Sequence, residues 1–126
     1  MANHNQHGIG RLWHATLYSL AGMRAAWRHE AAFRLEVSLA LVMVPAAFWL
    51  GGSIVERLLL IGSCLVVLIT ELLNSAIEAA IDRISDDQHR LSARAKDMGS
   101  AAVFLSLWLA GVTWSLIAYE HFFGKL

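Results

Sequence analysis

Long apolar stretches separated by short polar segments dominate the pattern of this chain. Three such stretches cover about residues 36–55, 57–82 and 97–120, and the two outer ones carry charge only at their edges. A membrane hydrocarbon core about 30 Å thick takes roughly 20 residues of helix to cross, so each stretch is long enough to span it. A Gly-Gly-Ser tripeptide at 51–53 predicts a tight return between the first two. The pattern therefore predicts an all-α membrane protein with three transmembrane helices.

The segment before the first span, about residues 8–34, has the periodicity of an amphipathic helix. Its apolar positions recur at helical spacing, at Ile9, Leu12, Trp13, Leu20, Met23 and Trp27. Arg11, His14 and Arg28 fall on other faces. Such a helix can lie on the membrane surface or pack against its own bundle, and the one-sided pattern favours the surface. A cleavable signal peptide is not expected, because no continuous apolar core precedes a small-residue cleavage site.

Basic residues are concentrated on one side of the expected spans. They precede the first span or lie between the second and third, at Arg11, Arg24, Arg28, Arg34, Arg83, Arg90, Arg94 and Lys96. Only Arg57 and Lys125 belong to the other side. Because positively charged loops stay in the cytoplasm, we expect a cytoplasmic amino terminus and a carboxyl terminus on the outer side.

The composition agrees with a membrane protein of one domain. Of 126 residues, 57% are hydrophobic and 16% are charged, which leaves no room for a second domain beside three spans. The formal net charge is zero, so no nucleic-acid partner is expected. Cys64 is the single cysteine, so the chain can form no internal disulfide. We therefore expect residues 1–126 to form one membrane domain.

One face of the second span is polar. At about 100° per residue a single helical stripe carries Glu71, Asn74, Ser75, Glu78 and Asp82. An ionisable side chain in the middle of a membrane helix costs about 2.5–3.5 kcal/mol on a lenient insertion scale, so such residues usually face protein, water or a ligand. A single membrane glutamate can simply join two helices through a hydrogen bond worth about 0.6 kcal/mol. The gathering of carboxylates on one stripe instead favours a functional site.

The sequence has no glycine-rich phosphate loop. Neither GxxxxGK[ST] nor GxGxxG occurs, and Gly8-Ile9-Gly10 is too short to count. A protein that binds phosphate without such loops must use side chains and a metal ion, and Mg²⁺ favours a few carboxylates together with phosphate oxygens. The chain offers suitable groups, with carboxylates at Glu30, Glu78 and Asp97 and cations at Arg11, Arg94 and Lys96.

Three segments carry a resemblance to a known family. They read ELLNSAIEAAIDR over 71–83, ARAKDMGSAAV over 93–103 and GMRAAWRHEAAFR over 22–34. Together they resemble the bacterial integral-membrane diacylglycerol kinases, and the likeness runs over nearly the whole chain. The spacing ExxNSxxExxxD is far more specific than a lone motif. The sequence departs from the family pattern at Ala93 and Leu20, neither of which is a candidate base or metal ligand.

The resemblance implies an ATP-dependent kinase that converts diacylglycerol to phosphatidic acid at the cytoplasmic face of the bacterial inner membrane. It implies a homotrimeric bundle with the carboxyl terminus in the periplasm. Glu71 is then the general base with Asn74 beside it, and Glu30 and Glu78 are ligands of the Mg²⁺ that accompanies ATP. The implied nucleotide contacts are Arg11, Tyr18, Glu30, Glu78, Asp87, Gln88, His89, Lys96 and Asp97. The implied lipid contacts are Arg11, Ala15, Ser19, Leu20, Arg24, Ala25, Ala26, Trp27, Ala32, Phe33, Arg34, Leu35, Glu36, Trp49, Leu50, Gly51, Gly52, Arg57, Glu71, Ser100, Trp114, Ser115, Leu116, Ile117, Ala118 and Tyr119.

Two other functions stay open from the residues alone. Related three-span proteins phosphorylate a polyprenol such as undecaprenol, which would use the same groups. A small oligomeric channel or proton relay could use Glu71 as an ion site. The channel explains the buried carboxylate but leaves Glu30, Lys96 and Asp97 without a role.

The pattern also predicts particular contacts. Because one chain offers few cations opposite the stripe, we expect a pocket that takes Glu30 from one chain and Glu71 to Glu78 from another. Asp82, at the end of its helix, either belongs to the functional stripe or only caps that helix or pairs with Arg83.

Overall fold

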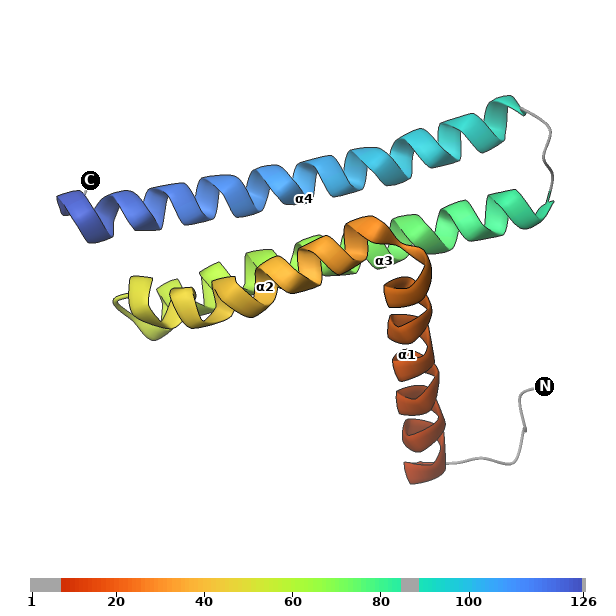
Figure 1. The fold of residues 1–126 in the computed structure, drawn as a ribbon, viewed down its shortest axis with the longest axis horizontal. Helices are drawn as coiled ribbons and strands as arrows, with labels where there is room; N and C mark the ends of the chain where they lie inside the picture. Colours follow the sequence, from red (N-terminus) through yellow and green to blue (C-terminus); the bar gives the residue numbers. More distant parts are fainter. Residues whose placement is uncertain (1–7, 85–88, 126) are drawn as a thin grey trace.

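The computed structural model describes residues 8–84 and 89–125, and all regular structure within them is helical. The helices are α1 (Ile9–His29), α2 (Ala31–Leu50), α3 (Ile54–Ile84) and α4 (Arg90–Phe123). α2, α3 and α4 run side by side, while α1 points away from them at the amino-terminal end of α2 (Figure 1). The predicted all-α class is confirmed.

Three helices are long and apolar enough to cross a membrane, namely α2, α3 and α4. The three predicted spans are thus confirmed, although their ends differ. α3 has 31 residues and α4 has 34, more than the roughly 20 that a bilayer core requires. Both helices therefore extend into the polar region, where they carry the charged residues next to the connection between them.

The expected surface helix ends earlier than residue 34. Glu30 leaves the helical conformation, with φ −118° and ψ 107°, and residues from Ala31 onward belong to α2. The break carries no glycine or proline that would have revealed it in the sequence. Arg34 stabilises it, because its Nη1 donates to the carbonyl oxygens of Trp27 at 2.8 Å and Arg28 at 3.2 Å. A cation at the carboxyl end of a helix satisfies carbonyls that have no partner within the helix.

The return between α2 and α3 is tight, as predicted. Gly51 is buried, and a methyl group in place of its hydrogen would lie 2.7 Å from Arg57 Cγ. Two hydrogen bonds of Glu56 hold the start of α3: its N–H donates to Ser53 Oγ at 3.2 Å, and its Oε2 accepts from the Gly52 N–H at 3.0 Å. The spacing of Ser53 and Glu56 is that of a capping box.

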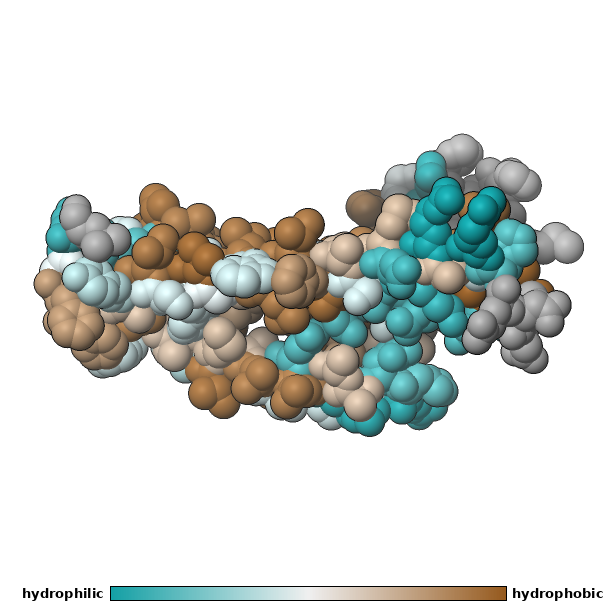
Figure 2. All heavy atoms as spheres, turned by 90° about the horizontal axis from the view of Figure 1, so that it is seen from above, coloured by the Kyte–Doolittle hydropathy of each residue, from teal (hydrophilic) through white to brown (hydrophobic). Residues whose placement is uncertain are grey.

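A small apolar core lies toward the return and the carboxyl end of α4. Its buried members are Ala47, Leu50, Leu60 and Ile117, with Ile61, Trp114 and Ala118 packed against them. The Trp114 indole N–H donates to the Leu60 carbonyl at 3.2 Å. Most other large apolar side chains of the described helices are exposed in the single chain. Figure 2 shows them over the shared length of the spans, with hydrophilic residues gathered at the end near α1 and the α3–α4 connection.

Candidate active site

The predicted polar stripe of α3 is partly buried. Glu71 is 7% exposed, the deepest of the stripe. Asn74, Ser75 and Glu78 are half-buried, and Asp82 is exposed. Asn74 Nδ2 donates to Glu78 Oε1 over 3.4 Å, a long hydrogen bond between residues one helical turn apart. The helix therefore carries these groups from an apolar depth toward the polar end of the molecule.

A third carboxylate joins the stripe from the α1–α2 junction. The charges of Glu78 and of Glu30 both act on the Glu71 carboxylate within the same chain. Glu30 is half-buried because it stands at the break between the helices rather than on an open helical face. Within one chain Glu30 thus lies close enough to α3 for its charge to act on Glu71, and whether a neighbouring chain also supplies a Glu30 stays a prediction.

This arrangement suits a magnesium ion that is shared with phosphate. Among the described residues, no group of three or more His, Cys, Asp or Glu side chains could hold a metal on its own. Mg²⁺ is usually held by one or two carboxylates plus substrate phosphate oxygens and waters, so Glu30 and Glu78 form a fitting partial ligand set. Negative charge gathered around the buried Glu71 also favours a cation at this place.

A groove of about 590 Å³ runs between α1 and α3, with Glu30 in its wall. Its walls are mostly apolar, and Glu30, His29, Ser19 and Ser75 supply the polar groups. The remaining lining residues are Gly22, Met23, Ala25, Ala26, Leu72, Ala76 and Ala79. Three predicted lipid contacts, Ser19, Ala25 and Ala26, therefore lie in this groove. An apolar trough with a carboxylate on its wall suits an amphiphilic ligand.

Lys96 lies across from the stripe on α4. Its Nζ pairs with Asp82 Oδ1 at 2.9 Å, and the two side chains are 44% and 65% exposed. Asp82 thus pairs with Lys96 and not with Arg83. The charge of Glu78 also acts on Lys96. Exposed ion pairs contribute little to stability, so Lys96 can exchange Asp82 for a phosphate at little cost.

The other predicted nucleotide contacts are scattered. Asp97 is exposed one residue beyond Lys96, whereas Asp87 and Gln88 lie outside the described residues. Arg11 and Tyr18 are exposed on α1, and Arg11 lies in its first turn, at the end farthest from α3 (Figure 1). The chain on its own therefore does not bring Arg11 to the carboxylates.

His89 has a structural role that the sequence did not reveal. It is the N-cap residue of α4, and its Nδ1 accepts a hydrogen bond from the Leu91 N–H at 3.1 Å. Its place directly before a long helical pattern was the available signal, although histidine is not among the usual capping residues. The predicted nucleotide contact at His89 stays a prediction.

The predicted lipid contacts fall into two regions. On α1, Ser19, Ala25 and Ala26 line the groove beside Glu30. Around the α2–α3 return and the end of α4, four of them belong to the apolar core or pack against it, namely Leu50, Trp114, Ile117 and Ala118, and the Trp114 indole N–H donates to the Leu60 carbonyl. Leu60 and Glu71 are eleven residues apart on α3, which is about 16 Å along a helix. Contacts at Trp49, Trp114 and their neighbours would therefore meet the chains of a lipid rather than its reacting group.

Glu36, a predicted lipid contact, lies close enough to Glu71 to be affected by its charge. Its carboxylate experiences the charge of Glu71, and its buried Oε2 has no hydrogen-bond partner within the described residues. The side chain borders a small cavity of about 100 Å³ together with Met43, Cys64 and Leu107. A glutamate at the edge of a predicted span was a signal for this, but its neighbour could not be identified without the packing of α2 on α3.

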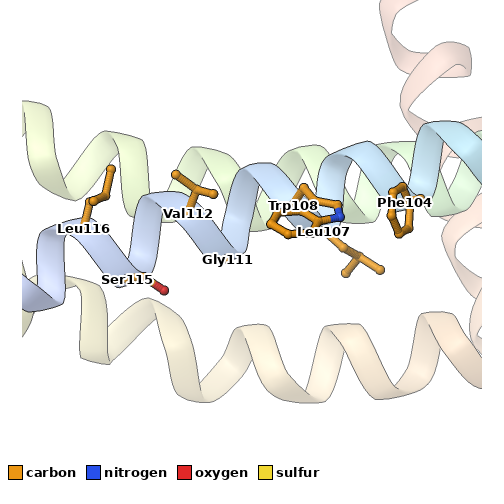
Figure 3. A pocket seen from close by; sticks show the side chains of 7 residues that line it. All are labelled: Phe104, Leu107, Trp108, Gly111, Val112, Ser115 and Leu116. Atoms are coloured by element: carbon orange, nitrogen blue, oxygen red, sulfur yellow. The ribbon is translucent and has the colours of Figure 1, made fainter.

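A second concave surface follows the outer face of α4 (Figure 3). It has a volume of about 560 Å³ and is lined by Phe104, Leu107, Trp108, Gly111, Val112, Ser115 and Leu116. None of these side chains is ionisable. This surface therefore offers no acid, base or metal ligand, and the groove beside Glu30 is the better candidate for chemistry.

The chain is similar to known proteins over most of its length. The model of the family described as prokaryotic diacylglycerol kinase matches residues 17–118, which include all three carboxylates. A protein of Escherichia coli named diacylglycerol kinase is 50% identical over 122 residues, covering 97% of this chain and 99% of that protein. One of Pseudomonas aeruginosa with the same name is 56% identical over 112 residues, covering 89% and 91%. One of Helicobacter pylori is 41% identical over 110 residues, covering 87% and 83%.

Proposed function

The chain belongs to the prokaryotic diacylglycerol kinase family, and on that premise we propose that it transfers the terminal phosphoryl group of ATP to diacylglycerol. The product is phosphatidic acid. The observation that carries the proposal is the buried Glu71 with Glu30 and Glu78 around it, inside a segment that the family model matches. The groove between α1 and α3 offers a place for an amphiphile next to these groups.

In the proposed reaction Glu71 acts as the general base. It accepts the proton of the diacylglycerol hydroxyl while that oxygen forms a bond to the terminal phosphorus of ATP. The bond from this phosphorus to the bridging oxygen breaks, and ADP leaves. Such transfers need positioning and charge neutralisation more than covalent chemistry. Burial suits Glu71 to this role, because its carboxylate is shielded from competing water.

The remaining groups neutralise and position the nucleotide. Glu30 and Glu78 would hold the magnesium ion, which would offset the charge of the triphosphate. Lys96 turns from Asp82 to the phosphates, and its neighbour Asp97 contacts the nucleotide. Asn74 holds Glu78 in place through its amide nitrogen.

We place this chemistry at the cytoplasmic face of the bacterial inner membrane. The basic residues and the carboxylates lie toward the same polar end of the molecule, the end that the positive-inside rule assigns to the cytoplasm. The amino terminus is then cytoplasmic and the carboxyl terminus periplasmic. The exposed apolar helices and the distant Arg11 support a homotrimer, in which neighbouring chains complete each site.

Label transfer from ATP radiolabelled on its terminal phosphoryl group tests the function. Purified protein in mixed micelles is given diacylglycerol, undecaprenol or no lipid, with Mg²⁺ or with a chelator. We expect label in phosphatidic acid, only in the presence of Mg²⁺. Preferential labelling of undecaprenol would assign a polyprenol kinase, and no labelling of either lipid would reject both kinases.

A further inference from the structure

Gly99 lies where α4 comes close to the polar stripe of α3. It is buried, and a methyl group in place of its hydrogen would overlap Asn74 Oδ1 and lie 3.3 Å from Asn74 Cγ. The same methyl group would make only an ordinary contact with Ile77 Cδ1, at 3.7 Å. The Asn74 carboxamide therefore occupies the space that any side chain at position 99 would need.

This occupancy distinguishes Gly99 from the other glycines of the described helices. Methyl groups at Gly10, Gly22, Gly62 and Gly111 would meet nothing within 4 Å. Glycine lowers helix stability relative to alanine, so a glycine within a helix is unfavourable unless its small size is used. At position 99 the small size is used by one particular side chain.

Asn74 reaches Glu78 from this position. Its Nδ2 donates to Glu78 Oε1, while its buried Oδ1 has no hydrogen-bond partner in the described part of the chain. Only the nitrogen of a carboxamide can donate to a carboxylate. The orientation that sets Oδ1 against Gly99 is therefore the one that turns the donor toward Glu78. The side chain is short, so it cannot yield to a methyl group at position 99 without moving that donor.

We propose that Gly99 is a positioning residue for the phosphoryl transfer. It leaves the space in which the Asn74 carboxamide is held toward Glu78, and it thereby orients a carboxylate that binds magnesium. This inference rests on the proposed function, because only that function makes Glu78 a metal ligand. Groups that orient a metal ligand from outside the coordination shell typically change metal affinity or activity about 10- to 100-fold when they are lost.

A double-mutant cycle tests the contact and its consequence. Wild type, Gly99→Ala, Asn74→Ala and the double variant are compared in lipid vesicles, with Gly111→Ala as the matched helical control. The readouts are the thermal unfolding midpoint and the magnesium concentration for half-maximal label transfer. We expect Gly99→Ala to lower the midpoint and to raise the magnesium requirement about 10-fold, and Gly111→Ala to do neither. In the Asn74→Ala background, Gly99→Ala should no longer lower the midpoint, because the displaced group is gone.

The inference would be overturned if Gly99→Ala lowered the thermal midpoint equally in the wild-type and Asn74→Ala backgrounds. It would also be overturned if Gly99→Ala had the same midpoint and magnesium requirement as Gly111→Ala. If Gly99→Ala does not fold, a folded double variant supports the contact, and failure of both variants rejects it. A wild-type protein without lipid kinase activity would refute the proposed function and the magnesium part of this inference. The midpoint cycle would still decide whether Gly99 accommodates Asn74, so the two failures are distinguishable.

Discussion

Glu71 is buried inside an otherwise apolar helix, and two further carboxylates act on it. A single buried glutamate could serve only to join helices. Three carboxylates brought to one place repel each other, and such an arrangement is costly without a cation. The burial of Glu71 under the charges of Glu30 and Glu78 therefore favours a site that binds a cation over a packing role.

At the scale of residues, the sequence predicted which side chains share one face of a helix better than it predicted which residues they contact. The stripe of α3 was predictable, because helical spacing alone places Glu71, Asn74 and Glu78 on one face. The pairing of Asp82 with Lys96 and the contact of Asn74 with Gly99 were not predictable. Both depend on how far α4 is shifted along α3, and no local pattern fixes that register.

The metal assignment predicts a change in magnesium dependence. Glu30→Gln and Glu78→Gln each remove one anionic oxygen ligand, so each should raise the magnesium concentration for half-maximal activity, by about 10-fold or more. Titration of label transfer against Mg²⁺ at saturating ATP measures this. Glu120→Gln, at the opposite end of α4, serves as the control. An unchanged titration in either variant would remove that residue from the metal site.

At the scale of elements, the spans were predictable and the break at Glu30 was not. Hydropathy is a local property, and it located α2, α3 and α4. No glycine or proline lies near Glu30, so no residue in the sequence marked the end of α1. The break depends on the Arg34 guanidinium, which binds carbonyls of the last turn of α1. The same break places Glu30 beside the groove.

We predict that Arg34→Gln loosens this junction. The substitution removes two hydrogen bonds from a charged donor, and partial exposure limits the cost to about 1 kcal/mol of stability. Activity should fall together with the thermal midpoint, because Glu30 loses its fixed place. Arg28→Gln removes a charge from the same region without removing a hydrogen bond of the Arg28 side chain, and it should be nearly silent. Equal effects of the two substitutions would show that charge, rather than the junction, matters.

At the scale of the whole molecule, the chain leaves long apolar faces and a distant Arg11. In a membrane, lipid and other copies of the chain cover such faces. Three carboxylates gather within one chain, but α1 carries Arg11 away from them. The sequence could not show that Glu30 lies near α3 whereas Arg11 lies far from it, because the direction of α1 relative to α3 depends on the break at Glu30.

Subunit mixing distinguishes groups within a chain from groups between chains. Glu71→Gln and Glu30→Gln proteins should regain no activity when co-assembled, since both residues are needed in one chain. Glu71→Gln and Arg11→Gln proteins should regain part of it, because a neighbour can supply Arg11. Label transfer by the mixed preparations measures both. Recovery in the Glu71 and Glu30 pair would instead show that the carboxylates come from different chains.

The most direct test of the account is phosphoryl transfer by Glu71→Gln. Glutamine keeps the volume and hydrogen-bonding capacity of the side chain but cannot accept the proton of the lipid hydroxyl. Losing a general base typically lowers the rate about 10² to 10⁴-fold. We predict a loss of kcat of that size for transfer from ATP to diacylglycerol, with an unchanged thermal midpoint and full activity in Glu120→Gln. A Glu71→Gln protein that retains full kcat would contradict the account, because its buried carboxylate would then be structural.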